Sequence, residues 1–182
     1  QSLRLPGEDA AALPFVQGVI LDHLLQTPHE RRTLEALLDK AIVDVSFLRS
    51  RSETSRLAGD LLWKHFLRHD QPLDASRVLE QLADRPDRDY GLEQRVHYVD
   101  LARQAAASAR RLPASRAIVE RLSNKLDIAV RVQLPLMHEL QLVASDERVS
   151  SRWRSAARER RQELQELAGL QELYQVASDF SM

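Results

Sequence analysis

The stretch from Leu57 to Ala106 constrains this chain most, because it holds three helical patterns separated by short polar turns. Within each pattern the apolar residues recur three or four positions apart, which is the spacing of one helix face. Helices joined by so few residues pack antiparallel. The stretch therefore predicts a helical hairpin followed by the first helix of the next one. Its predicted core consists of Leu62, Trp63, Phe66, Val78, Leu79 and Leu82.

The composition of the whole chain favours the same class of structure. Its 182 residues include only 5 glycines and 7 prolines, whereas helix-favouring residues are abundant and no convincing strand pattern occurs. Hairpins that each bury a neighbour's face stack into a solenoid. We predict an all-α protein, an irregular and elongated right-handed α-solenoid of about seven to eight helices in stacked antiparallel hairpins. It forms a single segment over residues 1–182, with a frayed lead-in at 1–9.

Two helices are expected before the hairpin. The first begins near Pro14 and ends near Gln26. The second begins at the sequence Thr27-Pro28-His29-Glu30, which has the residue types of a capping box, and continues to Leu48.

A long helical pattern runs from Ala114 to Leu142 and is apolar on two sides, as in a helix sandwiched between neighbours. Pro135 lies within it. A proline inside a helix removes one backbone hydrogen bond and clashes with the preceding turn. We therefore predict a kink between Arg131 and Pro135.

The C-terminal part predicts a helix that is capped by Ser145 and broken by Gly169. Its inward-facing residues are expected to be Trp153, Ala156, Ala157, Leu164, Leu167 and Ala168. After the break, Leu170, Leu173, Tyr174 and Val176 form an apolar face that no later helix of the chain can cover. Leu170, Leu173 and Tyr174 are therefore a candidate interface.

Four segments follow one another in a fixed order: LLWKHFLRHDQPLDASRVLEQLAD, LEQRVHYVDLARQAA, LDIAVRVQLPLMHEL and LQELAGLQELYQVASDF. In that order they resemble the C-terminal α-solenoid of the large inner-ring scaffold nucleoporins of the nuclear pore complex. The resemblance covers Ser55 to Phe180. The region before Ser55 does not match the family residue by residue, and the tail stops where the family's stack continues. Both ends are therefore interpreted as the boundaries of a fragment.

The resemblance implies a function as well as a fold. It implies a structural scaffold component of the inner ring that supports nucleocytoplasmic transport, located at the nuclear pore complex in the nuclear envelope. Its partners would be other nucleoporins, above all flexible linker nucleoporins whose short linear motifs dock between helices. It implies no catalysis, no small-molecule substrate, no cofactor and no membrane insertion of this segment.

Two other functions remain open from the residues alone. One is a generic helical-repeat adaptor in trafficking or signalling, since the hairpin also echoes a tetratricopeptide unit, although Trp63 stands where that repeat has a small glycine. The other is a nucleic-acid binder, because six arginines and Trp153 occur between Arg148 and Arg161. A solvated or internally paired helix face explains such a charge run more simply.

The remaining features argue against an enzyme or a metal site. His65 and His69 have the spacing of two metal ligands on a helix, but Asp70 is the one local candidate for a third. The chain has no cysteine, which excludes disulfides and thiolate chemistry. Nucleotide-binding and nucleophile-elbow motifs do not occur. A net charge of -1 gives no overall attraction to nucleic acid or anionic membrane.

Overall fold

The computed structural model describes residues 45–52, 55–86 and 90–180. These residues form eight α-helices, one π-helical segment and no strand, so the all-α prediction is confirmed. The helices are α3 (Val45–Ser52), α4 (Arg56–Arg68), α5 (Pro72–Asp84), α6 (Leu92–Ser108), α7 (Pro113–Ile128), α8 (Leu134–Ser145), α9 (Ser151–Glu163) and α10 (Leu170–Asp179). The π segment η2 (Ala129–Gln133) joins α7 to α8. The predicted lead-in, the helix after Pro14 and the capping box at Thr27 lie outside the described residues.

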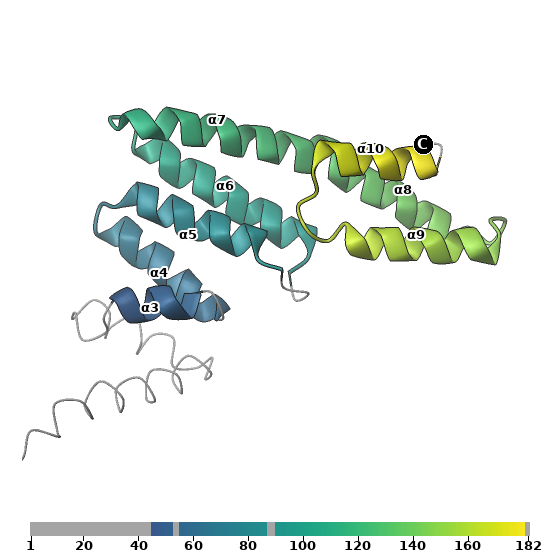
Figure 1. Cartoon of the computed structure of the whole chain (residues 1–182), viewed down its shortest axis with the longest axis horizontal. Coiled ribbons are helices and arrows are strands. Elements are labelled where there is room, and N and C mark those ends of the chain that lie inside the picture. The colour runs from purple at the N-terminus through teal and green to yellow at the C-terminus, as the bar shows by residue number, and fades with distance from the viewer. Residues whose placement is uncertain (1–44, 53–54, 87–89, 181–182) are drawn as a thin grey trace, which may run out of the picture. The chain divides into compact units, whose positions relative to one another are not determined.

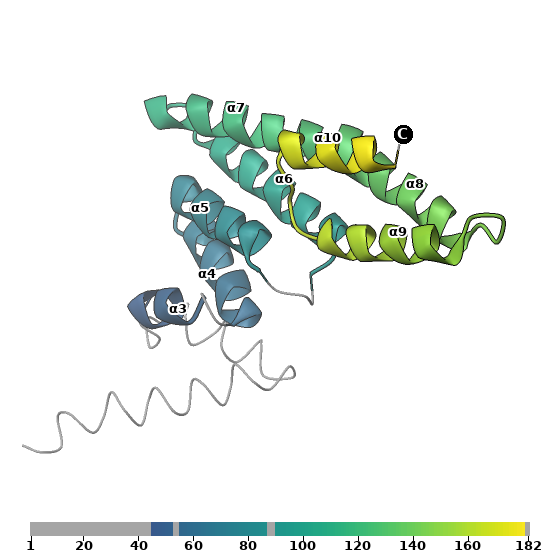
Figure 2. The same ribbon diagram turned by 45° about the vertical axis from the view of Figure 1, so that its right-hand side comes forward.

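The contacts divide the chain into two compact units, with the boundary between His69 and Asp70. In the first unit α3 packs against α4. In the second unit α5 packs against α6, α6 against α7, and α8 against α9 (Figures 1 and 2). Successive helices thus pack as neighbours within each unit, as in stacked hairpins. The single continuous stack over the whole chain, its elongation and its handedness stay predictions.

Helix α4 begins where the sequence supplies a capping hydroxyl. The Oγ atom of Ser55 accepts a hydrogen bond from the backbone N–H of Ala58 at 3.3 Å, which satisfies one of the unpaired amides of the first turn. Leu62 and Phe66 are buried on one face of the helix. Trp63 is partly buried, and its indole Nε1 donates a hydrogen bond to Asp60.

Truncating Phe66 tests the core of the first unit. The side chain is 4% exposed, and the guanidinium of Arg49 in α3 lies 5.8 Å from the centre of its ring. Phe66→Ala should lower the free energy of unfolding by about 3–5 kcal/mol, because it removes apolar contacts and leaves a cavity. Urea denaturation of the wild type and the variant measures this loss. Leu67→Ala is the control, because Leu67 follows Phe66 in the same helix and is 41% exposed. A loss below about 1 kcal/mol for Phe66→Ala would contradict its assignment to the core.

The turn after α4 and the start of α5 follow from Asp70 and Pro72. Asp70 has a φ of 56°, a left-handed conformation that short polar residues tolerate. Pro72 then occupies the first turn of α5, where its missing amide costs nothing. Val78, Leu79 and Leu82 lie on the buried face of α5.

A buried arginine joins the end of α5 to α6. Arg95 of α6 is 1% exposed, and its Nη1 donates hydrogen bonds to the carbonyl oxygens of Ala83 at 2.8 Å and Arg85 at 2.5 Å. Its guanidinium also lies 5.9 Å from the ring centre of Tyr90. The last carbonyls of a helix have no partner within the helix and carry partial negative charge. Arg95 supplies that partner from a neighbouring helix.

The long pattern from Ala114 to Leu142 is interrupted near the position that the proline predicts. The π segment precedes Pro135, and within it the backbone N–H of Leu134 bonds to the carbonyl of Ala129, five residues earlier. Since Pro135 has no N–H, the regular helical bonding pattern cannot continue through it. The interruption takes the form of the π segment Ala129–Gln133. This segment begins two residues before the predicted kink and overlaps it.

The side chain of Gln133, at the end of this π segment, is fully buried. Its Nε2 donates to the carbonyls of Leu164 at 2.9 Å and Glu166 at 2.5 Å, and its Oε1 accepts from the N–H of Ala168 at 3.2 Å. One amide thus satisfies three backbone groups of the loop between α9 and α10. That loop is thereby tied to the α7–α8 junction.

The predicted start of α9 needs a correction. Ser145 does not cap this helix, since it is the last residue of α8 and its Oγ donates back to the carbonyl of Gln141 at 2.9 Å. The helix begins at Ser151, after a loop in which the Asp146 carboxylate accepts the backbone N–H of Arg148 at 2.9 Å. This hydrogen bond and a second one from the Arg148 side chain lower the pKa of Asp146. The predicted break at Gly169 also lies too late, because α9 already ends at Glu163 and Gly169 is the residue that precedes α10.

Candidate functional site

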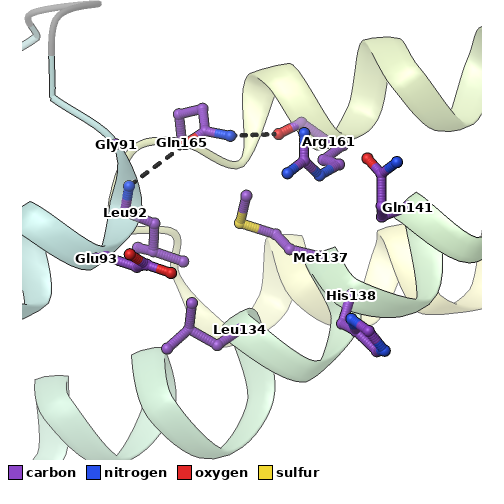
Figure 3. Close-up of a pocket in the computed structure, with 9 residues that line it drawn as sticks. All are labelled: Gly91, Leu92, Glu93, Leu134, Met137, His138, Gln141, Arg161 and Gln165. Carbon is purple, nitrogen blue, oxygen red and sulfur yellow. Dashed lines mark hydrogen bonds between the residues drawn. The ribbon is translucent and has the colours of Figure 1, made fainter.

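A groove lies between α8 and α9 and is closed at one end by the start of α6 (Figure 3). It encloses about 390 Å³. We call it the α8/α9 groove. Its lining residues are Gly91, Leu92, Glu93, Leu134, Met137, His138, Gln141, Arg161 and Gln165.

Gln165 holds the closed end of the α8/α9 groove in place. Its Oε1 accepts a hydrogen bond from the backbone N–H of Leu92 at 3.3 Å, and its Nε2 donates to the carbonyl of Arg161 at 3.4 Å (Figure 3). The side chain therefore links the first amide of α6 to the last turns of α9. Gly91 precedes that amide, and a Cβ atom built on it would lie 3.6 Å from the Gln165 Oε1, an ordinary contact.

The floor of the α8/α9 groove is apolar and belongs to the core of the second unit. Leu92 and Met137 are 2% and 7% exposed, and Leu134 packs against the same cluster. In Figure 3 the sulfur of Met137 points into the space between α8 and α9. A methionine thioether is flexible and polarizable, so it adapts to apolar groups of different shape. The floor can accept an apolar side chain.

The α9 side of the groove carries positive charge without a paired carboxylate. Within the described residues neither Arg158 nor Arg161 lies within ion-pair distance of an acidic group, although Arg158 donates to the carbonyl of Ala144 at 3.3 Å. The Nε of Arg161 is shielded from solvent and has no hydrogen-bond partner there. Their neighbour Arg160 differs, because a hydrogen bond to Glu163 raises its pKa and it also pairs with Asp179 at 3.6 Å.

The sequence offered no signal for this groove. It predicted a helix that is apolar on two sides from Ala114 to Leu142, but the gap above Leu134 and Met137 depends on how α6, α8 and α9 meet. The polar residues around it look like any solvated helix face in the sequence.

The residues of the candidate interface at the C-terminal end differ in their exposure to solvent. Leu173 is 1% exposed and Val176 is 3% exposed, because both pack into the cluster formed with α8 and α9. They are therefore not part of an uncovered face. Leu170 and Tyr174 remain exposed, at 43% and 69%. An interface at Leu170 and Tyr174 stays a proposal, without Leu173.

Trp153 also differs from its prediction. It was expected to face inward, yet it is 48% exposed and packs edge-to-face against Phe180, with ring centres 5.3 Å apart. The other predicted inward residues of this region are buried or partly buried: Ala156, Ala157, Leu164, Leu167 and Ala168. The α9 stripe is narrower than the sequence suggested, and small residues supply most of it.

The histidine pair does not form part of a metal site in the described ranges. The rings of His65 and His69 lie 4.2 Å apart between their centres, and His69 is exposed. Across those ranges no group of three or more potential ligands is close enough to hold a metal ion.

Comparison by sequence gives a match to a protein family. The profile of the non-repetitive/WGA-negative nucleoporin C-terminal family matches residues 30–180. The chain belongs to this nucleoporin family. The resemblance seen in the sequence is thereby confirmed. No protein matches significantly in a comparison with functionally curated sequences.

Solved structures similar to this nucleoporin segment share its fold. The Nup170 C-terminal domain of Chaetomium thermophilum matches 94% of the chain with a TM-score of 0.60 and 18% identity. The same domain solved in complex with Nup145N matches 94% of the chain with a TM-score of 0.60 and 17% identity. The chain spans 28% and 30% of the length of these two domains. In the described part of the segment, no helix is long and apolar enough to cross a membrane.

Proposed function

We propose that this chain is a structural scaffold segment of the inner ring of the nuclear pore complex. The observation that carries the proposal is the family match over residues 30–180, which include the packed helices of both units and the α8/α9 groove. Stacked helices that bury one another's faces supply a rigid support with extended surfaces for partners. The chain acts at the nuclear envelope, where it supports nucleocytoplasmic transport, and it catalyses no reaction.

The partners of the segment are other nucleoporins. The similar Nup170 domain was solved in complex with Nup145N, which supports a linker nucleoporin as the partner of this chain as well. A flexible linker binds a rigid helical surface through a short motif, which inserts apolar side chains between helices.

Proximity labelling tests the scaffold role. The chain, fused to a biotin ligase and expressed in cells of its source organism, should label nucleoporins well above a folded helical control protein fused to the same ligase. Circular dichroism of the purified chain establishes that it is folded. Labelling of trafficking or signalling proteins in place of nucleoporins would favour the generic adaptor and contradict the scaffold role.

The arginine-rich helix α9 calls for a separate measurement. A nucleic-acid binder would shift labelled RNA in a gel, with binding that weakens steeply as salt rises and is lost in Arg154→Glu and Arg158→Glu. We expect no such shift at physiological salt. Two observations support this expectation. Arg160 forms ion pairs with Glu163 and Asp179, and the ring of Trp153 packs against that of Phe180.

A further inference from the structure

We propose that the α8/α9 groove is the docking site for a linear motif in which an apolar residue lies next to an acidic one. The inference rests on the proposed docking function and names the site and the chemistry of the motif. The apolar residue enters over Met137, and the acidic residue binds the guanidinium of Arg161.

The volume and composition of the groove fit one short segment of chain. Its 390 Å³ lie within the roughly 300–1,000 Å³ of typical ligand pockets. The floor is the edge of an apolar cluster, so an inserted apolar side chain extends the core of the second unit. A second copy of the protein would need a contact of about 800 Å² on each side, far more than one such groove supplies.

The acidic residue follows from the state of Arg161. Arg161 lines the groove, and no carboxylate of the described residues lies within ion-pair distance of its guanidinium. A carboxylate matches a guanidinium with two parallel hydrogen bonds. Arg158, one turn earlier on α9, adds a second positive charge without a carboxylate within reach in the described residues.

The opposite end of the groove sets the direction of the motif. Glu93 is exposed at the start of α6 and lines the groove across from α9 (Figure 3). An acidic group of the motif is repelled there and attracted at Arg161. The carboxylate must therefore lie on the α9 side of the apolar anchor.

The test uses the whole chain and overlapping fluorescein-labelled peptides from the Nup145N counterpart of its source organism. Fluorescence anisotropy identifies the peptide that binds, which we expect to contain an apolar residue beside Asp or Glu. Arg161→Glu should weaken its binding about tenfold or more. Replacing the acidic residue of the peptide by arginine should restore binding to Arg161→Glu. Loss of folding cannot produce this reversal.

Two further variants test whether the groove itself is the binding site. Gln141→Trp fills the groove from an exposed position of α8 and should also weaken binding about tenfold. Arg152→Glu makes the same charge change as Arg161→Glu on the exposed start of α9, outside the groove, and should leave binding unchanged. Melting temperatures close to that of the wild type verify that the variants fold.

The negative outcomes distinguish a wrong docking site from a wrong docking function. A peptide that binds with the same affinity to Arg161→Glu and Gln141→Trp would place the docking site elsewhere, leaving linker docking intact. If the folded chain binds none of the peptides, both the groove and linker docking are wrong. The scaffold role itself is decided by proximity labelling.

Discussion

Gln133→Glu should lower the free energy of unfolding by about 5 kcal/mol or more. The wild-type amide donates to the carbonyls of Leu164 and Glu166 and accepts from the N–H of Ala168. A carboxylate can accept, but it cannot donate to the two carbonyls. The substitution therefore leaves two buried carbonyls facing a buried negative charge. Unfolded carbonyls and carboxylate are hydrated, so the whole cost falls on the folded state.

Chemical denaturation followed by circular dichroism measures the loss for Gln133→Glu. Gln141→Glu is the matched control, because Gln141 is exposed on α8 two turns later, and its effect should stay within about 0.5 kcal/mol. The Gln133→Glu variant should be least destabilised at acid pH, where the new carboxyl group carries a proton and can donate one hydrogen bond. Equal losses for both variants would contradict the bonding role of Gln133.

Arg95→Ala should also cost about 5 kcal/mol, enough to unfold a marginally stable chain. Hydrogen bonds to a charged group contribute roughly 1.5–3 kcal/mol each, and Arg95 makes two of them to the end of α5. Truncation also leaves a cavity where a side chain that is 1% exposed had packed. Both effects act at the packed α5–α6 pair, so this pair should lose its structure first.

Thermal denaturation and hydrogen exchange of Arg95→Ala test this role. Arg103→Ala is the control, since Arg103 lies on the same helix and pairs with Asp100 at the surface. An exposed ion pair of this kind contributes about 0–1 kcal/mol. We expect the amides of α5 and α6 to exchange faster in Arg95→Ala and to keep their protection in Arg103→Ala. Unchanged protection in Arg95→Ala would show that the α5 end does not depend on this residue.

The residues of the candidate interface show which part of burial an amphipathic pattern can predict. Leu173 and Tyr174 are adjacent in the sequence and both belong to the predicted apolar face, yet one is buried and the other is 69% exposed. The helix period separates them by about 100°, and α8 and α9 cover one side of α10. Which side is covered depends on where the α9–α10 loop directs the helix. Gln133 holds that loop from a site more than thirty residues earlier.

The sequence alone determined the helical class, some of the helix starts and the family. Pro72 and Pro113 act through their own backbone geometry in the first turns of α5 and α7, and Pro135 through its missing amide, so their effects are visible within a few residues. The family segments are likewise read directly from residue order.

The tertiary structure alone decided what the polar side chains do. Arg95, Gln133 and Arg161 are equally polar in the sequence, but the first two satisfy buried carbonyls and the third lines a groove. The Gln133 amide and the N–H of Ala168 are 35 positions apart, and the Gln165 amide and Leu92 are 73 apart. No local pattern encodes such pairs. They arise because burial requires every polar group to find a partner among the elements that packing brings together.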